Sequence, residues 1–121
     1  MSNAAVYVRW GRPTTGRETK SLEVFSQALE FYGTLKSKGK ISDFRTYFAT
    51  NGAMAQFGGF MLIEGTVAQC RDLVDGDDFQ KILIKAHHVV DNLEVVHMSM
   101  GDEIQKTIGR VLDARKQLGI T

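Results

Sequence analysis

The chain has 121 residues, 43% of them hydrophobic and 24% charged, which fits a single domain over residues 1–121 that can bury its own core. Fifteen basic and fourteen acidic side chains give a net charge of +1, so neither nucleic acid nor an anionic membrane surface is expected as a partner. The only cysteine, Cys70, cannot form a disulfide within the chain, and no signal peptide or long apolar run opens the sequence. A cytoplasmic location is the resulting expectation.

The first predicted elements are a strand over residues 5–11 and a helix from Glu18 to about Lys38. Apolar and polar side chains alternate in the strand, and apolar side chains recur at spacings of three and four in the helix. In the strand, Val6, Val8 and Trp10 lie on one side, and Tyr7 and Arg9 lie on the other. In the helix, the apolar stripe consists of Leu22, Phe25, Leu29 and Tyr32. Residues 2–4, Ser-Asn-Ala, are compatible with either a native start or a remnant of an expression vector, and no expectation rests on them.

A hairpin is predicted at the centre of the chain. Residues 41–50 form a second strand, with Phe44 and Phe48 on one side, and the glycine-fenced apolar run 58–66 forms a third. The connection 51–58 carries glycine and is short enough for the two strands to pair antiparallel.

A kinked helical region and a last strand should follow. Thr66 and Gln69 fit a capping box for a helix that runs to about Val74. Asp75-Gly76 interrupts the pattern, and residues 77–80 offer a second cap before a new apolar stripe. The last strand covers residues 93–100 and is expected to place Leu93, Val95, His97 and Ser99 on one face and Val96, Met98 and Met100 on the other. A terminal helix after Gly101-Asp102 should turn Ile104, Ile108, Val111, Leu112 and Arg115 toward a partner surface.

The order of elements predicts an α+β, ferredoxin-like βαββαβ fold with one C-terminal helix added. Right-handed crossovers place the helices on one face of a four-stranded antiparallel sheet. The opposite face is then expected to carry a half-polar surface that a second copy covers, so a two-fold homodimer is predicted. The residues expected on that face are Tyr7, Arg9, Arg45, Tyr47, Phe60, Leu62, Glu64, Leu93, Val95, His97 and Ser99.

The chain resembles the dimeric α/β-barrel superfamily of ferredoxin-like proteins, and within it a group of small bacterial proteins of unassigned function. The motifs that carry the resemblance are Gly11 to Arg17, Val24-Phe25, Phe31-Tyr32-Gly33, Gly39-Lys-Ile41, Gly59-Phe60, Glu64-Gly65 and Asp78-Phe79-Gln80. It implies the fold and a dimer. The superfamily includes cofactor-free monooxygenases, isomerases and haem-handling enzymes, but no catalytic motif of these enzymes is present, so no catalytic residue is carried over.

Two groups of residues are candidates for ligand binding. Arg9, Arg45, Glu64 and His97, with Tyr7, Tyr47, Phe60 and Leu62, would meet on the open face as an anion pocket with a titrating histidine, or as an ion-pair network between subunits. Arg12 and Arg17 precede a helix and would bind an anion, or pair with nearby carboxylates as part of a solvated loop. Glu64 is expected to pair with an arginine or tyrosine.

Metal and covalent chemistry are not expected. His87 and His88 point about 100° apart on a helix, so they are poorly placed for one metal ion, and no ligand set accompanies them. Cys70 is interpreted as a packing residue, and no cofactor is predicted.

Two functions are compatible with these patterns. The first is a dimeric binding or accessory module for a small, partly apolar anionic ligand. The second is a cofactor-independent monooxygenase or isomerase in which His97 is the acid/base and Arg9 or Arg45 stabilises an oxyanion. A pocket of at least ~300 Å³ that touches His97 would favour the enzyme.

Overall fold

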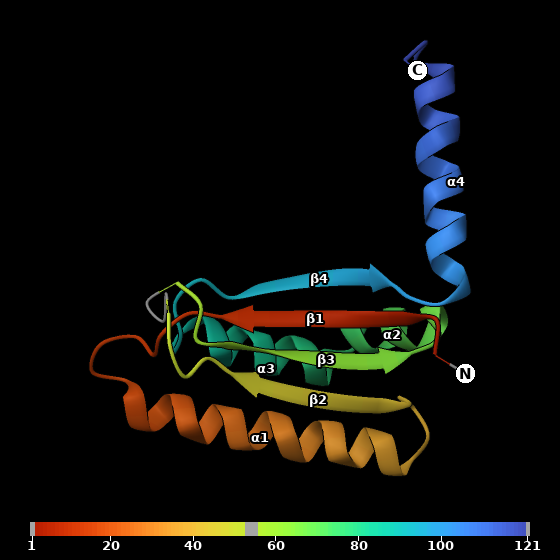
Figure 1. Cartoon of the computed structure of the whole chain (residues 1–121). Helices are drawn as coiled ribbons and strands as arrows, with labels where there is room; N and C mark the ends of the chain where they lie inside the picture. Colours follow the sequence, from red (N-terminus) through yellow and green to blue (C-terminus); the bar gives the residue numbers. More distant parts are fainter. Residues whose placement is uncertain (1, 53–55, 121) are drawn as a thin grey trace.

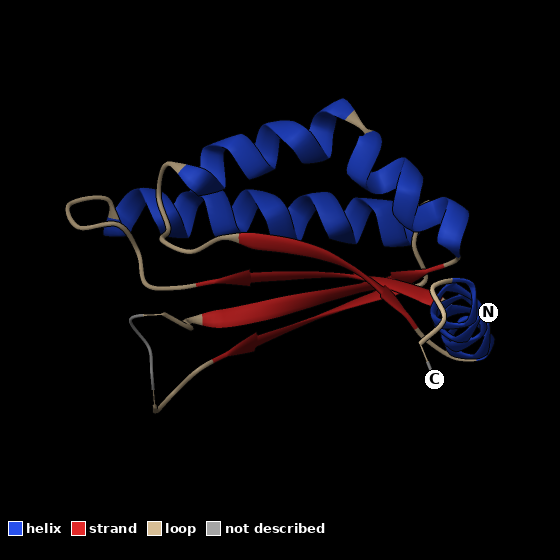
Figure 2. Ribbon diagram, turned by 90° about the horizontal axis from the view of Figure 1, so that it is seen from above, coloured by secondary structure: helices blue, strands red, loops and turns tan. Residues whose placement is uncertain are grey.

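The structure is a computed structural model that describes residues 2–52 and 56–120. Its elements are β1 (Ala4–Trp10), α1 (Glu18–Ser37), β2 (Asp43–Phe48), β3 (Gly59–Gly65), α2 (Val67–Asp75), α3 (Asp77–His87), β4 (Glu94–Ser99) and α4 (Asp102–Gln117). The strands form one antiparallel sheet in the order β2-β3-β1-β4. Helices α1, α2 and α3 lie on one face of this sheet (Figures 1 and 2). The predicted α+β, ferredoxin-like fold is confirmed.

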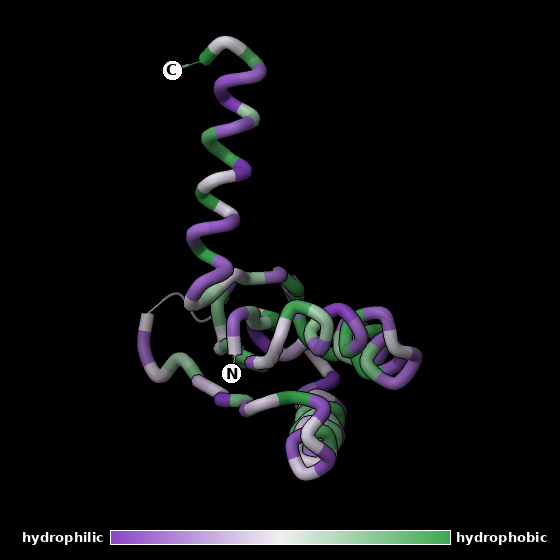
Figure 3. Tube along the Cα trace, turned by 90° about the vertical axis from the view of Figure 1, so that its right-hand side faces the viewer, coloured by the Kyte–Doolittle hydropathy of each residue, from purple (hydrophilic) through white to green (hydrophobic). Residues whose placement is uncertain are grey.

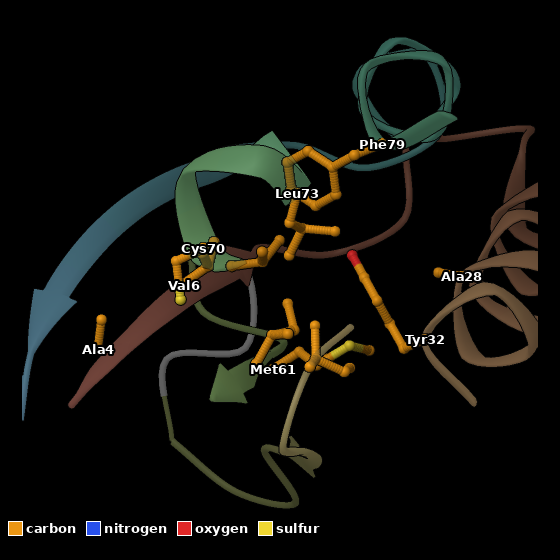
Figure 4. Close-up of a cluster of buried hydrophobic side chains, with 11 residues drawn as sticks. Ala4, Val6, Ala28, Tyr32, Met61, Cys70, Leu73 and Phe79 are labelled. Carbon is orange, nitrogen blue, oxygen red and sulfur yellow. The ribbon is translucent and has the colours of Figure 1, made fainter. Parts of the chain in front are cut away.

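The core lies between the sheet and these three helices (Figure 4). Every second residue of β1 and β3 points into it, because side chains alternate between the two faces of a strand. Val6, Ile63 and Phe79 have no exposed surface. The other buried members of the cluster are Ala4, Val8, Ala28, Tyr32, Ile41, Met61, Cys70 and Leu73.

Strands β2 and β3 form the predicted antiparallel hairpin, with Asp43 opposite Glu64 and Phe48 opposite Gly59. Phe44 and Phe48 point toward the helices, as expected. The ring of Phe44 lies 5.8 Å from that of Tyr32, and the ring of Phe48 lies 5.0 Å from that of Phe25. Part of the predicted connection, residues 53–55, lies outside the described residues.

The second helical region consists of two helices, as predicted, with Gly76 between them. The capping box is present: the Gln69 backbone N–H donates to Thr66 Oγ1 at 3.1 Å, and Gln69 Oε1 accepts from the Thr66 N–H at 2.9 Å. The prediction of a second cap at residues 77–80 is wrong, because α3 starts from Gly76 without a side-chain cap. Gln80 instead donates back to the Val74 carbonyl at 2.6 Å, which joins α3 to the end of α2.

Strand β4 has its faces reversed relative to the prediction. Val6 and Val8, whose side chains point to the core, pair with His97 and Val95. Leu93, Val95, His97 and Ser99 therefore lie on the helix side, and Glu94, Val96 and Met98 lie on the other side. The pattern was ambiguous because both sides of this edge strand are apolar, and a one-residue shift exchanges the faces of a strand. Leu93 and Val95 do pack against the core.

Helix α4 leaves the body and runs beyond the β4 edge of the sheet (Figures 1 and 3). None of its residues is buried. Across the described ranges, we find no helix with the length and apolar character needed to cross a membrane.

Candidate functional site: a strand-end cleft and the open sheet face

The sheet face opposite α1, α2 and α3 is called the open face, since no helix of the described residues covers it. Seven of the eight predicted ligand residues lie there. The register places on it Ala5, Tyr7, Arg9, Asp43, Arg45, Tyr47, Phe60, Leu62, Glu64, Glu94, Val96 and Met98. His97 belongs to the opposite face, so its predicted convergence with Arg9 and Arg45 is wrong.

An aromatic stack centred on Phe60 fills the middle of the open face. The ring of Tyr47 stacks on Phe60 at 4.9 Å, and Tyr7 lies 5.3 Å from it on the other side. Phe57, just before β3, lies 6.0 Å from the same ring. Tyr47 is still 44% exposed, so the stack presents apolar surface to solvent.

Both arginines of the open face and Glu64 are held by contacts within the chain. Glu64 accepts a hydrogen bond from Arg45 and forms an ion pair with it, so the expected pairing of Glu64 is confirmed. The hydrogen bond to Glu64 raises the pKa of Arg45. Arg9 donates to the Gln56 carbonyl at 3.1 Å and lies over the Phe57 ring at 5.2 Å.

One donor of this face stays without a partner. Arg9 Nε is buried and makes no hydrogen bond within residues 2–52 and 56–120. A buried donor of this kind costs free energy unless an acceptor reaches it. Arg9 Nε is therefore a donor that an acceptor from a ligand or a second copy of the chain would stabilise.

His97 lines a groove of about 420 Å³ on the helix side of β4. Its neighbours there are Cys70, Arg71, Ser99, Glu103 and Arg110. Burial raises the pKa of the Cys70 thiol. The groove is larger than the lower limit of about 300 Å³ for a ligand pocket, but His97 shares it with Arg71 and Arg110 rather than with Arg9 and Arg45.

A larger and more apolar cleft of about 510 Å³ opens where β1 and β2 meet the start of α1. We call it the strand-end cleft. Its walls are mostly apolar and include Trp10, Pro13, Leu22, Phe25, Phe48 and Val90, with Arg12 as the one charged side chain among its lining residues. A gap of about 70 Å³ between α1, α3 and the sheet shares Trp10, Ser21 and Phe25 with it. The cleft therefore continues toward the core.

Three aromatic rings form the wall of the strand-end cleft. Trp10 lies 6.0 Å from Phe25 and 5.8 Å from Phe48, in edge-to-face arrangements. Gly59 leaves room for this wall, because a Cβ there would lie 2.9 Å from Trp10 Cζ2. Sequence patterns assigned these rings to the core stripe. The Gly58-Gly59 pair opposite Trp10 is the signal that marked a close approach.

The loop of Arg12 and Arg17 is anchored to the connection between α3 and β4. Arg12 Nε lies 3.7 Å from the Asp91 carboxylate, and Arg17 donates to the His88 carbonyl at 2.7 Å. Thr14 Oγ1 donates to Asp91 at 3.0 Å. The Arg12 side chain is 61% exposed and stays available at the rim of the cleft, whereas Arg17 is turned to a backbone oxygen.

Metal binding has no support in the described parts of the chain, where no cluster of three or more histidine, cysteine or carboxylate side chains occurs. His88 Nδ1 lies 2.8 Å from the Ile84 carbonyl on its own helix. A further space of about 420 Å³ lies between the end of α1 and the α2–α3 junction, where Asp72, Asp77 and Asp78 line it, so its acidic wall suits a small anion less well than the strand-end cleft does.

The fold and these surfaces define a ferredoxin-like α+β protein with an apolar cleft at the strand ends and an uncovered sheet face. No family model matches the chain, and no curated protein matches it in sequence at a significant level. Among solved structures it is similar to a conserved protein from Methanosarcina mazei Go1, with 17% identity, a TM-score of 0.61, and coverage of 82% of this chain and 94% of that one.

A second similar structure is a dimeric protein of unknown function and ferredoxin-like fold from Bacteroides fragilis NCTC 9343. It has 9% identity and a TM-score of 0.58, and the match covers 80% of this chain and 96% of that chain. At these identities the likeness shows the fold alone. The resemblance to ferredoxin-like proteins of unassigned function is confirmed.

Proposed function

We propose that the chain is a homodimeric binding module for a small, partly apolar anion, and that the ligand occupies the strand-end cleft. One observation carries this proposal: an apolar cleft of about 510 Å³ has the guanidinium of Arg12 as its one charged lining group. Ligand pockets typically have volumes of about 300–1,000 Å³, with apolar walls and a few polar groups that set orientation.

The walls and the rim favour an aromatic carboxylate. A planar ring would pack against Trp10, Phe25 and Phe48, since aromatic pairs gain about 0.5–1.5 kcal/mol beyond area burial. The carboxylate would then reach Arg12, whose contact with Asp91 is long at 3.7 Å. A guanidinium binds a carboxylate well because two N–H groups can donate in parallel.

The dimer is proposed to form through the open face. Tyr47, Val96 and Met98 are 40–45% exposed there, and exposed apolar patches commonly mark interfaces. The similar protein from Bacteroides fragilis is dimeric, which supports a dimer for this chain. In this arrangement, the Arg45–Glu64 pair would lie within the interface.

Tryptophan fluorescence tests the cleft directly, because Trp10 is the only tryptophan. Phenylacetate should change its emission in a saturable way, and the neutral phenylacetamide should bind at least ~10-fold more weakly. Arg12→Gln should weaken phenylacetate binding to a similar extent. Lys20→Gln is the matched control and should leave binding unchanged, since Lys20 pairs with Glu23 on the surface of α1 and does not line the cleft. Equal binding of acid and amide would contradict the proposal.

The groove beside His97 favours a second candidate, a cofactor-independent enzyme. His97, Arg71 and Arg110 line one space of about 420 Å³, which combines a group that can move a proton with two that can hold an oxyanion. His97→Ala should then abolish turnover of a carbonyl acid without changing phenylacetate binding in the cleft. Turnover that survives in His97→Ala would contradict this candidate.

A further inference from the structure

Helix α4 carries an apolar stripe that no other part of residues 2–52 and 56–120 covers. The stripe consists of Ile104, Ile108, Val111 and Leu112, which are 43%, 45%, 53% and 58% exposed. These positions follow the spacing of one helix face. A single isolated helix of about 15 residues is marginal in water, and Gly109 within it costs about 1 kcal/mol more than alanine. The helix therefore needs a surface to pack on.

The base of α4 is held firmly enough to direct the helix away from its own body. Ser99 and Thr107 share a hydrogen bond of 2.7 Å between their hydroxyl oxygens, and the Met100 N–H donates to the Asn3 carbonyl at 3.0 Å. Glu103 is only 12% exposed in its side chain and pairs with Lys106 at 3.1 Å. From this base α4 runs past the β4 edge and away from the sheet (Figures 1 and 3).

The area of the open face indicates why a second copy needs the helix. Four strands spaced about 4.8 Å apart and about 21 Å long give a flat area of roughly 400 Å². A stable interface buries about 800 Å² on each partner. A 16-residue helix is about 24 Å long and about 10 Å wide, so it covers roughly 240 Å² of a partner and hides as much of itself. Sheet and helix together come near the required area.

Charge also fits a second copy of the chain. The outer half of α4 carries Arg110, Arg115 and Lys116 with a single acidic residue, Asp113. The open face has three carboxylates, Asp43, Glu64 and Glu94, against two arginines. Opposite net charges on two surfaces steer association and disfavour wrong pairings.

We infer that α4 is a dimerisation arm whose stripe of Ile104, Ile108, Val111 and Leu112 packs against a second copy of this chain, next to the contact between open faces. The inference rests on the proposed dimer and adds that α4 stabilises this dimer. The arm acts through apolar burial, so its contribution should resist salt better than ion pairs do.

Sedimentation equilibrium tests the arm. Ile108→Asp and Leu112→Asp should each raise the dimer dissociation constant at least ~30-fold, as expected for an anchor of an interface. Gln117→Asp is the matched control, because about 100° per residue places position 117 on the opposite side of the helix. It introduces the same charge and should leave the constant unchanged. Since α4 buries no residue in its own chain, the unfolding temperature of the body should not change when wild type and variants are compared at a concentration where both are monomeric.

A fourth variant separates the arm from the proposed open-face dimer. Tyr47→Asp places a charge in the aromatic stack and should also dissociate the dimer. Tyr47→Asp could give monomers while both α4 variants keep the dimer dissociation constant of the wild type. In that case the inference about α4 is wrong, and the open-face dimer is supported. If only the α4 variants dissociate, the arm stands and the open-face contact is wrong. A monomeric wild type at high micromolar concentration overturns both.

Discussion

Gly58 approaches Gly11 so closely that a methyl group on Gly58 would fall well inside the contact distance of the Gly11 carbonyl oxygen. The Gly58 N–H donates to the neighbouring Trp10 carbonyl at 2.6 Å, which ties the start of the third strand to the end of the first. This contact sits on the rim of the strand-end cleft, so the stability of the chain and the shape of the cleft depend on the same pair of glycines.

Gly58→Ala should lower the free energy of unfolding by about 2–4 kcal/mol, because the backbone on both sides has to move. Gly33→Ala is the control, since a Cβ at Gly33 meets no atom within 4 Å. In a helix interior that change should stabilise the chain by about 0.5–1 kcal/mol. Urea unfolding measures both, and a Gly58→Ala variant as stable as the wild type would contradict the close approach.

Glu64→Gln should have an effect that depends on protein concentration. In dilute monomer the Arg45 side chain is 52% exposed, and solvent screens its ion pair with Glu64, so loss of the pair should change stability little. In a dimer through the open face, the same change leaves a buried charge without a partner, which costs more. Unfolding curves at low and high concentration measure the difference. Glu23→Gln breaks the exposed ion pair with Lys20 on α1. This control should change the free energy of unfolding only slightly at both protein concentrations.

Because of Tyr32, the free energy of unfolding should fall as the pH rises above about 10. Burial raises the pKa of Tyr32 above its ordinary 10.0, so below about pH 10 the hydroxyl is protonated in both states. Above that pH the unfolded chain releases its proton and the native chain does not, and stability falls by up to about 1.4 kcal/mol per pH unit. Tyr32→Phe should remove this part of the slope in urea titrations between pH 9 and 11. Parallel slopes in the two proteins would contradict the prediction.

Cys70 should react with thiol reagents only when α2 opens. Cys70 is 2% exposed, so a reagent hardly reaches its sulfur. Burial also raises the pKa of the thiol, so little of it is present as the reactive thiolate. At pH 8, labelling by a disulfide reagent should be at least ~100-fold slower than in the urea-unfolded chain. Asp72→Cys in a Cys70→Ala background places a thiol on the exposed side of the same helix and should react fast. Equal rates would show that the thiol is reachable in the native state.

The sequence predicted most of the fold because its apolar spacing agreed with its caps. Helix α1, the central hairpin and the capping box of Thr66 and Gln69 all combine a local signal with a buried face. The second cap failed because Asp77 and Asp78 lie inside the first turn, where acidic residues favour the helix dipole without acting as a cap.

The candidate site was harder to predict, since strand β4 gave no decisive pattern. Val95 and Val96 are equally apolar, so hydropathy cannot say which one enters the core. Only the pairing of Val6 with His97 decides it. The strand-end cleft was missed for a related reason: Trp10, Phe25 and Phe48 have the spacing of core residues, and the space beside them arises from how β1, β2 and α1 end.

Asn3 joins three parts of the chain within one residue. Its N–H donates to Gly65, its carbonyl accepts from Met100, and its side-chain oxygen accepts from the Val67 N–H at the start of α2. Asn3 thus holds together the end of β3, the first turn of α2 and the residue just before α4. Fusion partners and labels attached ahead of residue 3 without a spacer should loosen these contacts and let the angle of α4 vary, while attachments after Gly119 leave them intact.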